Sequence, residues 1–190
     1  VYSYGYMMGI QAAAEEYDVQ YDYYPVYDAG FTDSAAGNTT TGNMYQNGVN
    51  VVFADCGNVG DGITERADSD GRLAIQTDAD LDSTHPGHII TSVLKITGVP
   101  TRALIDAKIS GELDGMDNLL NFDLASGATG ITDLSVMTEA VADKDLFEQI
   151  KAKVNDQAEK IKSGEIDVVN AQIGETFDPS ACPRVTIQTA

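Results

Sequence analysis

The chain has 190 residues, the length of one ordinary domain, and its composition is strongly acidic. Thirty Asp and Glu residues outnumber eleven Lys and Arg residues, which gives a formal net charge of -19. DNA, RNA and anionic lipid bind cationic surfaces that displace counterions, so this composition excludes them as expected partners. The acidic residues are spread along the chain, which is typical of a highly soluble surface.

The chain opens on Val1, and its first ten residues have the pattern of the middle of a structural element. We therefore expect a piece of a longer or processed chain. The sequence contains neither a signal peptide nor a run of eighteen apolar residues, so we expect this piece to be soluble. Cys56 and Cys182 lack the spacing of a zinc site. Two unrelated thiols are the favoured interpretation, and a long-loop disulfide remains open.

Helix and strand patterns alternate along the first half of the chain. Residues 6–17 have apolar positions at helical spacing, and the aromatic residues 22–27 favour a strand. Residues 32–47 predict a helix, and the apolar residues 49–54 a buried strand. The pattern continues with a loop over 56–62, a weak helix up to residue 71, a strand over 72–77, a polar loop over 78–87 and a strand over 88–94.

The second half is dominated by two helical patterns. Residues 100–110 begin with Pro100 in the first turn and precede a glycine, which predicts a helix. Residues 119–124 are a strand candidate. Residues 144–163 form the clearest helix, with one apolar stripe closed by a glycine. Residues 170–190 show little periodicity beyond 185–187.

This alternation predicts an α/β fold with a parallel-rich sheet and flanking helices. Ligands of such sheets bind beyond the carboxyl ends of the strands. The informative residues are therefore those that follow the predicted strands, within 27–33, 53–60, 77–82 and 91–95.

An aromatic residue and a glycine loop follow the strand over 49–54. Phe53 is placed to stack on a flat ligand, although a plain core role is the alternative. Asp55 comes next, and Gly57 belongs to a loop that matches neither a dinucleotide fingerprint nor a Walker loop. A tight turn is the favoured role for that glycine, with close approach of the backbone to a ligand as a second possibility.

Two carboxylates and a lysine follow the next two strands. Asp78 is suited to accept hydrogen bonds from the vicinal hydroxyls of a sugar. Asp78 and Asp80 could instead form a turn or, with Asp82, an acidic metal site, but the calcium-loop pattern fails. Lys95 ends the strand over 88–94 and can donate to a ligand or hold Asp78 ionised, with an ordinary surface lysine as the alternative.

No arrangement typical of catalysis is found. His85 and His88 are three residues apart, but Pro86 between them disfavours a helix that would give them a shared metal-binding face. The sequence has no nucleophile elbow and no plausible nucleophile–base pair. We therefore expect a protein that is not an enzyme, with no catalytic residue, no metal and no cofactor. An α/β hydrolase is kept as the less favoured alternative.

Five segments in order resemble the basic membrane protein family, whose best-known members are purine-nucleoside receptor lipoproteins. Residues 4–13 resemble the family's helix with a GYxxG start. Residues 28–33, which contain Phe31, resemble its GSFxD loop. Residues 48–57 are similar to GADVVFAAAG. Residues 77–95 are similar to VDxDQ…PGxVLTSxxK, the most specific match, and residues 160–168 to KIxSGEIxV.

The resemblance implies one lobe of a type I periplasmic-binding fold, with ligand held between two lobes. It assigns residues 1–98 to the ligand-binding C-terminal lobe and 99–125 to a crossover segment of a missing N-terminal lobe. Residues 126–169 would return to the C-terminal lobe, and 170–190 would be a tail. The helix over 100–110 should then expose apolar surface.

The resemblance also implies a function. The family's stacking aromatic, ribose-binding Asp and nearby Lys fall on Phe53, Asp78 and Lys95. This sequence departs from the family pattern at four positions: Asp55 and Cys56 replace small residues, Gln76 replaces a Gly, and Leu81 replaces a Gln. These changes alter the polar groups around the site, so the identity of the ligand is open.

The implied protein is the solute-binding component of an ABC importer, with a nucleoside, most often a purine nucleoside, as ligand. Its partners would be a membrane permease and an ATPase, and its location extracytoplasmic, as a lipoprotein or in the periplasm. A fragment such as this chain would also be able to associate with another chain. The alternative is a binding or sensor domain of the same fold for a sugar or another small solute.

Overall fold

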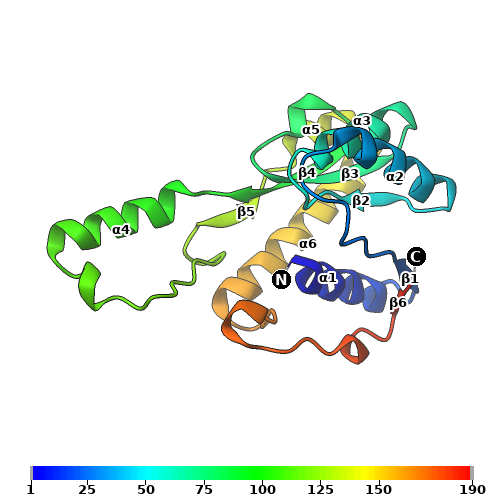
Figure 1. Cartoon of the computed structure of the whole chain (residues 1–190). Coiled ribbons are helices and arrows are strands. Elements are labelled where there is room, and N and C mark those ends of the chain that lie inside the picture. Colours follow the sequence, from blue (N-terminus) through cyan, green and yellow to red (C-terminus); the bar gives the residue numbers. More distant parts are fainter. Residues whose placement is uncertain (1, 189–190) are drawn as a thin grey trace. The chain divides into compact units, whose positions relative to one another are not determined.

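The computed structural model describes residues 2–188 and divides the chain into two compact units. One unit combines the two ends of the chain, residues 1–28 and 164–190. The other is the continuous segment 29–163, which contains every residue that the sequence analysis assigns to a ligand site. Figure 1 shows the elements in chain order.

The larger unit is built on a four-stranded sheet with the order β2-β3-β4-β5. β2 (Val51–Phe53), β3 (Leu73–Asp78) and β4 (Ile89–Lys95) are parallel, and β5 (Thr129–Ile131) pairs antiparallel with β4. Phe53 pairs with Ile75, and Asp78 pairs with Leu94. The predicted α/β class with a parallel-rich sheet is confirmed.

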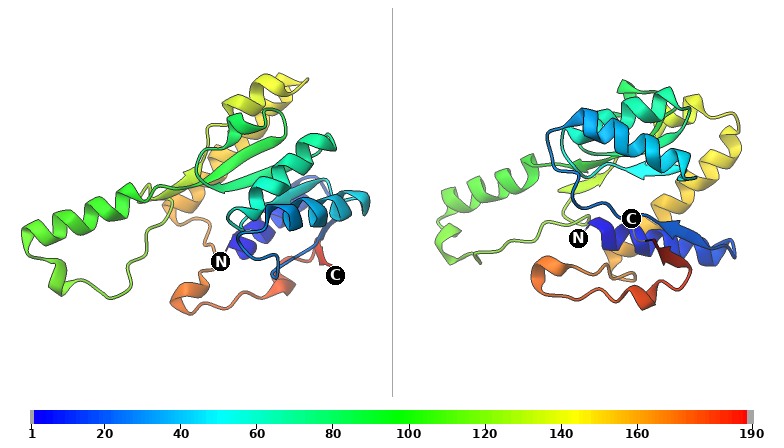
Figure 2. Two further views of the ribbon diagram at one scale, coloured as in Figure 1. Left: turned by 45° about the horizontal axis from the view of Figure 1, so that its top comes forward. Right: turned by 45° about the vertical axis from the view of Figure 1, so that its right-hand side comes forward.

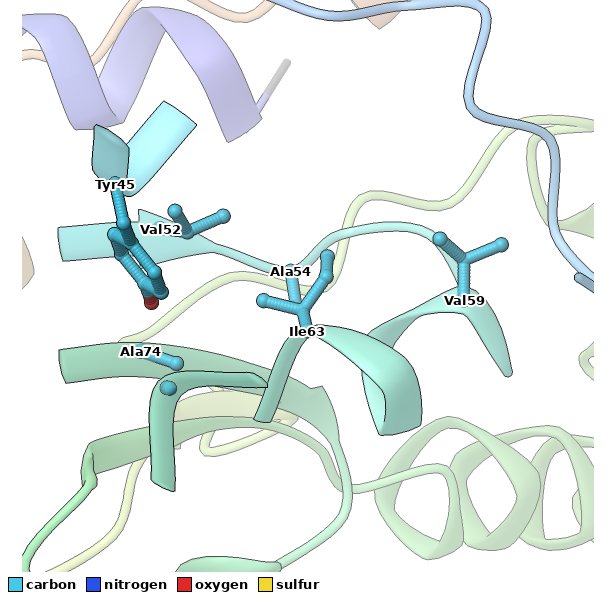
Figure 3. Close-up of a cluster of buried hydrophobic side chains, with 7 residues drawn as sticks. Tyr45, Val52, Ala54, Val59, Ile63 and Ala74 are labelled. Carbon is cyan, nitrogen blue, oxygen red and sulfur yellow. The ribbon is translucent and has the colours of Figure 1, made fainter. Parts of the chain in front are cut away.

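One face of this sheet is covered by α2 (Ser34–Gln46) and α3 (Val59–Ser69). Their apolar side chains pack on the sheet in a buried cluster, most of which Figure 3 shows: Tyr45, Val52, Ala54, Val59, Ile63, Ala67 and Ala74. The Tyr45 hydroxyl donates to the backbone carbonyl of Leu73 at 2.9 Å. This partly buried hydrogen bond joins the end of α2 to the start of β3.

Two glycines allow α2 and α3 to approach each other closely. A Cβ atom at Gly62 would collide with the backbone carbonyl of Ser34 and lie 2.9 Å from the backbone nitrogen of Asn38. A Cβ atom at Gly37 would collide in the same way with the carbonyl of Val59. The backbones therefore touch where any other residue would hold them apart.

The opposite face of the sheet packs against α5 (Ser135–Ala140) and α6 (Lys144–Ser163). Leu134, Met137 and Phe147 are buried there, with Leu73 and Ile90 of the sheet against them. Leu73 and its neighbour Ala74 serve different clusters because successive side chains of a strand point to opposite faces. The observed bounds of α6 are those that its apolar stripe predicted.

α4 (Gly98–Ser110) follows β4 and extends away from the sheet (Figures 1 and 2). Only Ala107 of this helix is buried, whereas Leu104, Ile105 and Ile109 are exposed, Ile109 to 79%. Gly111 ends the helix in the left-handed conformation, and the one-turn helix η2 (Leu113–Gly115) follows. The expected apolar exposure of this helix is therefore observed.

The smaller unit joins α1 (Tyr2–Glu16) and β1 (Tyr21–Tyr23) to the C-terminal segment. β6 (Val185–Ile187) pairs parallel with β1, and two short helices, η3 (Ala171–Ile173) and η4 (Pro179–Ala181), precede it. Met7, Cys182 and Val185 form its core, and the rings of Tyr4 and Phe177 stack with centroids 4.6 Å apart. Both cysteines are free thiols, and they lie in different units.

Several sequence-based boundaries differ from the structure. The strand over 119–124 is wrong: the segment is irregular, and its end folds into a turn in which Asp123 accepts from the Ser126 amide at 2.9 Å. β5 and α5 were not foreseen. β1 is shorter than predicted, since Pro25 has no amide proton for a ladder. Within residues 2–188, no helix combines the length and apolar composition needed to cross a membrane.

Candidate functional site

Phe53, Asp78 and Lys95 are the last residues of β2, β3 and β4. Because these three strands are parallel neighbours, their final residues lie along the same edge of the sheet. The structure brings Asp78 and Lys95 into contact, whereas Phe53 pairs in register with Ile75, three residues before Asp78. Val52 and Ala54 point into the core under α2 and α3, so Phe53 points to the opposite face.

Asp78 and Lys95 form an ion pair across the ends of β3 and β4. The Lys95 Nζ and Asp78 Oδ1 atoms are 2.5 Å apart, and both side chains are about half exposed. Asp78 adopts a left-handed backbone conformation, with φ of 78°. A residue other than glycine pays a steric cost in that conformation, and such strain gathers at functional sites.

The two residues before Asp78 hold this strand end in place. The buried Thr77 hydroxyl donates to the Ala54 carbonyl at 2.9 Å, which links β3 to the residue after β2. The buried Gln76 amide donates to the Gly60 carbonyl at 3.0 Å in the first turn of α3. Gln76 and Thr77 thus connect the end of β3, immediately before Asp78, to α3 and to the residue after β2.

Asp55 lies in the loop after β2, next to the ion pair. Loss of water around the Asp55 carboxylate raises its pKa; the nearby Lys95 ammonium opposes this shift, and the negative charge of Asp78 adds to it. These mutual effects show that the three charged groups share one electrostatic environment. Sequence reasoning named all three residues, but it had no means of ranking which of them interact.

Gly57 and Phe31 come from adjoining loops of the same edge. The Phe31 carbonyl accepts a hydrogen bond from the Asn58 amide at 3.0 Å, and a Cβ atom at Gly57 would lie 3.0 Å from that carbonyl. Gly57 has a left-handed backbone, with φ of 57°. The glycine therefore permits close contact with the Phe31 loop, in agreement with its tight-turn interpretation. The Phe31 side chain is 71% exposed.

Asp80 is held in a turn. Its Oδ1 atom accepts from the Asp82 amide at 3.2 Å, which is the turn-forming role that was left open. Asp82 begins η1 (Asp82–Thr84) and is buried; its carboxylate accepts from the Ser92 hydroxyl at 2.6 Å. Ser92 also accepts from the Leu81 amide at 3.1 Å. Asp82 and Ser92 thus position the loop that follows Asp78.

The sequence analysis did not predict the hydrogen bond between Asp82 and Ser92. The available signal was a hydroxyl within the apolar pattern of β4, at the position where Ser92 is fully buried. A buried polar side chain needs a hydrogen-bonding partner, and the loop provides one.

The arrangement offers hydrogen-bond acceptors and one cation, with exposed aromatic surface beside them. Among residues 2–188, no three metal-binding side chains are grouped so that they could hold an ion. The two histidines serve a different purpose: His85 Nδ1 lies 2.8 Å from Asp68 Oδ2, and His88 Nε2 lies 3.4 Å from Asp68 Oδ1. They connect the loop before β4 to α3.

The fold is shared by lobes of solute-binding proteins. A solute-binding protein of an ABC transporter system from Aeropyrum pernix K1 matches with a TM-score of 0.66 and 22% identity, over 94% of this chain and 55% of that one. A second, from Conexibacter woesei, matches with a TM-score of 0.54 and 18% identity over 74% and 44%. A transcriptional activator of the comK gene from Bacillus halodurans has the same fold, with a TM-score of 0.61 and 15% identity over 72% and 44%.

Sequence comparison identifies the family of the chain, which the similarity of fold does not. Residues 1–172 match the family of PnrA-like ABC transporter substrate-binding proteins, and the chain belongs to that family. Basic membrane protein B of Borreliella burgdorferi is 31% identical over 99 residues, which are 51% of this chain and 28% of that protein. The chain thus spans about half the length, or less, of the relatives it matches. The resemblance to the basic membrane protein family is confirmed.

Proposed function

We propose that the protein containing this chain is the solute-binding component of an ABC importer and that it binds a nucleoside, most often a purine nucleoside. The observation that supports this is the alignment of Phe53, Asp78 and Lys95 on consecutive strand ends. An aromatic ring can stack on a base, a contact worth about 1–3 kcal/mol. The carboxylate can accept from ribose hydroxyls, and the ammonium can donate to a ribose or base oxygen.

The rest of the edge supports a small polar ligand. Asp55, Gly57, Phe31 and Asp80 surround the three strand ends with acceptors, open backbone and one more aromatic ring. Gln76, Thr77, Asp82 and Ser92 are buried and hydrogen-bonded behind them. Such support keeps the binding groups in position before ligand arrives, which lowers the entropic cost of binding.

In this proposal a second lobe closes over the strand ends and provides the other wall of the site. Residues 99–125 belong to that lobe as a crossover segment, while 1–98 and 126–169 form the ligand-binding lobe and 170–190 a tail. The exposed Leu104, Ile105 and Ile109 of α4 support this division, because such apolar side chains are normally covered in a complete protein.

The proposed partners are the permease and ATPase subunits of the importer. Such a receptor works outside the cytoplasm, in the periplasm or attached to the membrane as a lipoprotein. It carries ligand and performs no catalysis.

The test is calorimetry on the complete protein with adenosine, guanosine, uridine, ribose and free bases. We expect micromolar or tighter binding of at least one nucleoside, and recovery of that nucleoside unchanged. Binding of a sugar without a base would favour a receptor or sensor for another solute. Conversion of the nucleoside would favour a hydrolase. Failure of every nucleoside to bind the folded protein would refute the proposal.

A further inference from the structure

Two buried polar side chains, Ser92 and Asp82, join the middle of β4 to the loop that follows Asp78. The Ser92 hydroxyl donates to the Asp82 carboxylate at 2.6 Å and accepts from the Leu81 amide at 3.1 Å. Ser92 is fully buried, and Asp82 is only 2% exposed. Polar groups buried to this degree are stable only while they keep a hydrogen-bonding partner. The loop is therefore fixed to the sheet at this point.

The backbone of Ser92 is itself held from both sides. Its amide donates to the Thr132 hydroxyl at 3.2 Å, and its carbonyl accepts from the Thr132 amide at 3.0 Å, directly after β5. On the other side, Ser92 lies in register with Gln76 of β3, two residues before Asp78. The hydroxyl that holds the loop is thus carried by the interior of the sheet, where the backbone has little freedom to move.

Asp78 needs support on both sides because its backbone is left-handed, with φ of 78°. A residue other than glycine keeps such a conformation only where the surrounding structure holds it. The hydrogen bonds of Gln76 and Thr77 hold the chain before Asp78. Those of Ser92 hold it from Leu81 onward. The turn at Asp78 is therefore fixed at both ends.

We infer that Ser92 and Asp82 are positioning residues of the strand-end site, which determine how strongly Asp78 binds the sugar of the ligand. The inference rests on the proposed function, in which Asp78 accepts hydrogen bonds from ribose hydroxyls. Both residues are buried, so they act on ligand through Asp78 and not by contact. Hydrogen bonds from a sugar to a carboxylate require that carboxylate in a fixed place, and a supporting hydrogen bond behind it provides this.

The Asp82 carboxylate serves here as a hydrogen-bond acceptor, because its partner is a neutral hydroxyl. An amide oxygen accepts in the same way. Asp82→Asn should therefore keep the connection to Ser92, whereas Asp82→Ala and Ser92→Ala each remove it. The two substitutions of Asp82 both remove its negative charge, so the difference between them reports the hydrogen bond.

The experiment is a double-mutant cycle on the complete protein. Calorimetry measures the affinity for whichever of adenosine, guanosine and uridine the wild type binds most tightly. We expect Ser92→Ala to weaken binding about tenfold in the wild-type background but less than about twofold in the Asp78→Ala background, where the carboxylate that it positions is absent. Asp82→Ala should also weaken binding about tenfold, and Asp82→Asn should stay within about twofold of the wild type.

Tyr45→Phe is the matched control. It also removes a hydroxyl that hydrogen-bonds to β3, but at Leu73, the opposite end of the strand from Asp78. This variant should lose stability in urea and keep the wild-type affinity for the nucleoside. It thus separates a general loss of stability from a loss of positioning at the site.

The outcomes separate this inference from the proposed function. An equal loss for Ser92→Ala in both backgrounds, or no loss in either, overturns the positioning role and leaves the nucleoside receptor standing. An Asp82→Asn variant that binds as weakly as Asp82→Ala does the same. If the folded wild type binds no nucleoside, the proposed function fails and this inference fails with it. Circular dichroism checks that each variant is folded, and the two Asp82 variants decide the question if Ser92→Ala does not fold.

Discussion

Asp78 and Lys95 terminate neighbouring parallel strands, and their side chains form an ion pair of 2.5 Å at the carboxyl edge of the sheet. Each partner satisfies the other before any ligand is present. A ligand with both donors and acceptors can insert between them and keep both groups hydrogen-bonded. A ligand with acceptors only would bind Lys95 and leave the Asp78 carboxylate without a donor.

The first prediction concerns the division of work between Asp78 and Phe53 in the complete protein. Asp78→Ala should weaken nucleoside binding by about 1.5–3 kcal/mol and free-base binding much less, since hydrogen bonds to a charged group are lost only with the sugar. Phe53→Ala should weaken both by about 1–3 kcal/mol, since stacking depends on the base. Calorimetry with a nucleoside and its base measures the two effects. Equal losses for nucleoside and base in Asp78→Ala would remove Asp78 from the ribose role.

The second prediction concerns the strained backbone of Asp78. Glycine adopts a φ of 78° without steric cost, and alanine does not. Asp78→Gly and Asp78→Ala both lose the ion pair with Lys95, so the difference between them reports the strain less the larger unfolded-state entropy of glycine. We expect the Gly variant to be more stable to urea than the Ala variant by about 0.5–1 kcal/mol, although both bind nucleoside weakly. A Gly variant that is less stable than the Ala variant would contradict a strained conformation.

The third prediction concerns the contact between α2 and α3. Gly62→Ala should lower the free energy of unfolding by about 1–3 kcal/mol, because the new Cβ meets backbone atoms of Ser34 and Asn38 that cannot move aside singly. Gly9→Ala in α1 is the matched control, since its Cβ position has no atom within 4 Å apart from the chain neighbours and the backbone of its own helix. That variant should instead be more stable by about 0.5–1 kcal/mol, from helix propensity. Urea denaturation of the two variants measures both changes in stability. A Gly62→Ala variant as stable as the wild type would show that the two helices can move apart at little cost.

The fourth prediction concerns alkaline pH and Tyr45. Burial raises the pKa of Tyr45 to about 12, from an ordinary value of 10.0, because the ionised phenol would lose water and repel Asp70. A group whose pKa is raised on folding contributes its stability below the unfolded pKa and loses it as the pH rises through the folded one. The wild type should therefore lose an additional 2 kcal/mol or so of stability between pH 10 and about 12.

Tyr45→Phe provides the comparison. It lacks the titrating group and the hydrogen bond to Leu73, so at pH 8 it should be less stable by about 1 kcal/mol. The gap between the two proteins should close as the pH rises from 10 to 12, because only the wild type is losing this contribution. Urea titrations at pH 8, 10 and 11 measure the trend, and a gap that widens with pH would contradict it.

The fifth prediction concerns the exposed face of α4. Ile109→Ser should change the stability of the isolated chain by less than about 0.5 kcal/mol, because the side chain is 79% exposed there. In the complete protein the same substitution should cost about 1–3 kcal/mol, since the proposed second lobe covers it. Lys108→Ser, at the neighbouring exposed position, should have a small effect in both proteins. Equal effects of Ile109→Ser in the two proteins would remove residues 99–125 from the proposed lobe.

Features that depend on local pattern could be predicted from the sequence. The apolar stripe of residues 144–163 predicted α6, and the short apolar runs located β2, β3 and β4 to within two residues at each end. Because the carboxyl ends of parallel strands lie at one edge of a sheet, the same pattern also predicted that Phe53, Asp78 and Lys95, the last residues of β2, β3 and β4, belong to that edge. The predicted strand at 119–124 failed because a strand needs a neighbour to pair with, and periodicity carries no information about neighbours.

The identity of the interacting groups, by contrast, follows from the three-dimensional fold. The fold paired Lys95 with Asp78 and placed Asp55 within the electrostatic influence of both, an arrangement that depends on side-chain geometry within a few ångströms. It placed the buried Ser92 against Asp82, although 10 residues separate them in the chain. It also joined the two ends of the chain through β1 and β6, a pairing across more than 160 residues. Such contacts arise when distant segments bury a common core, and no local propensity specifies them.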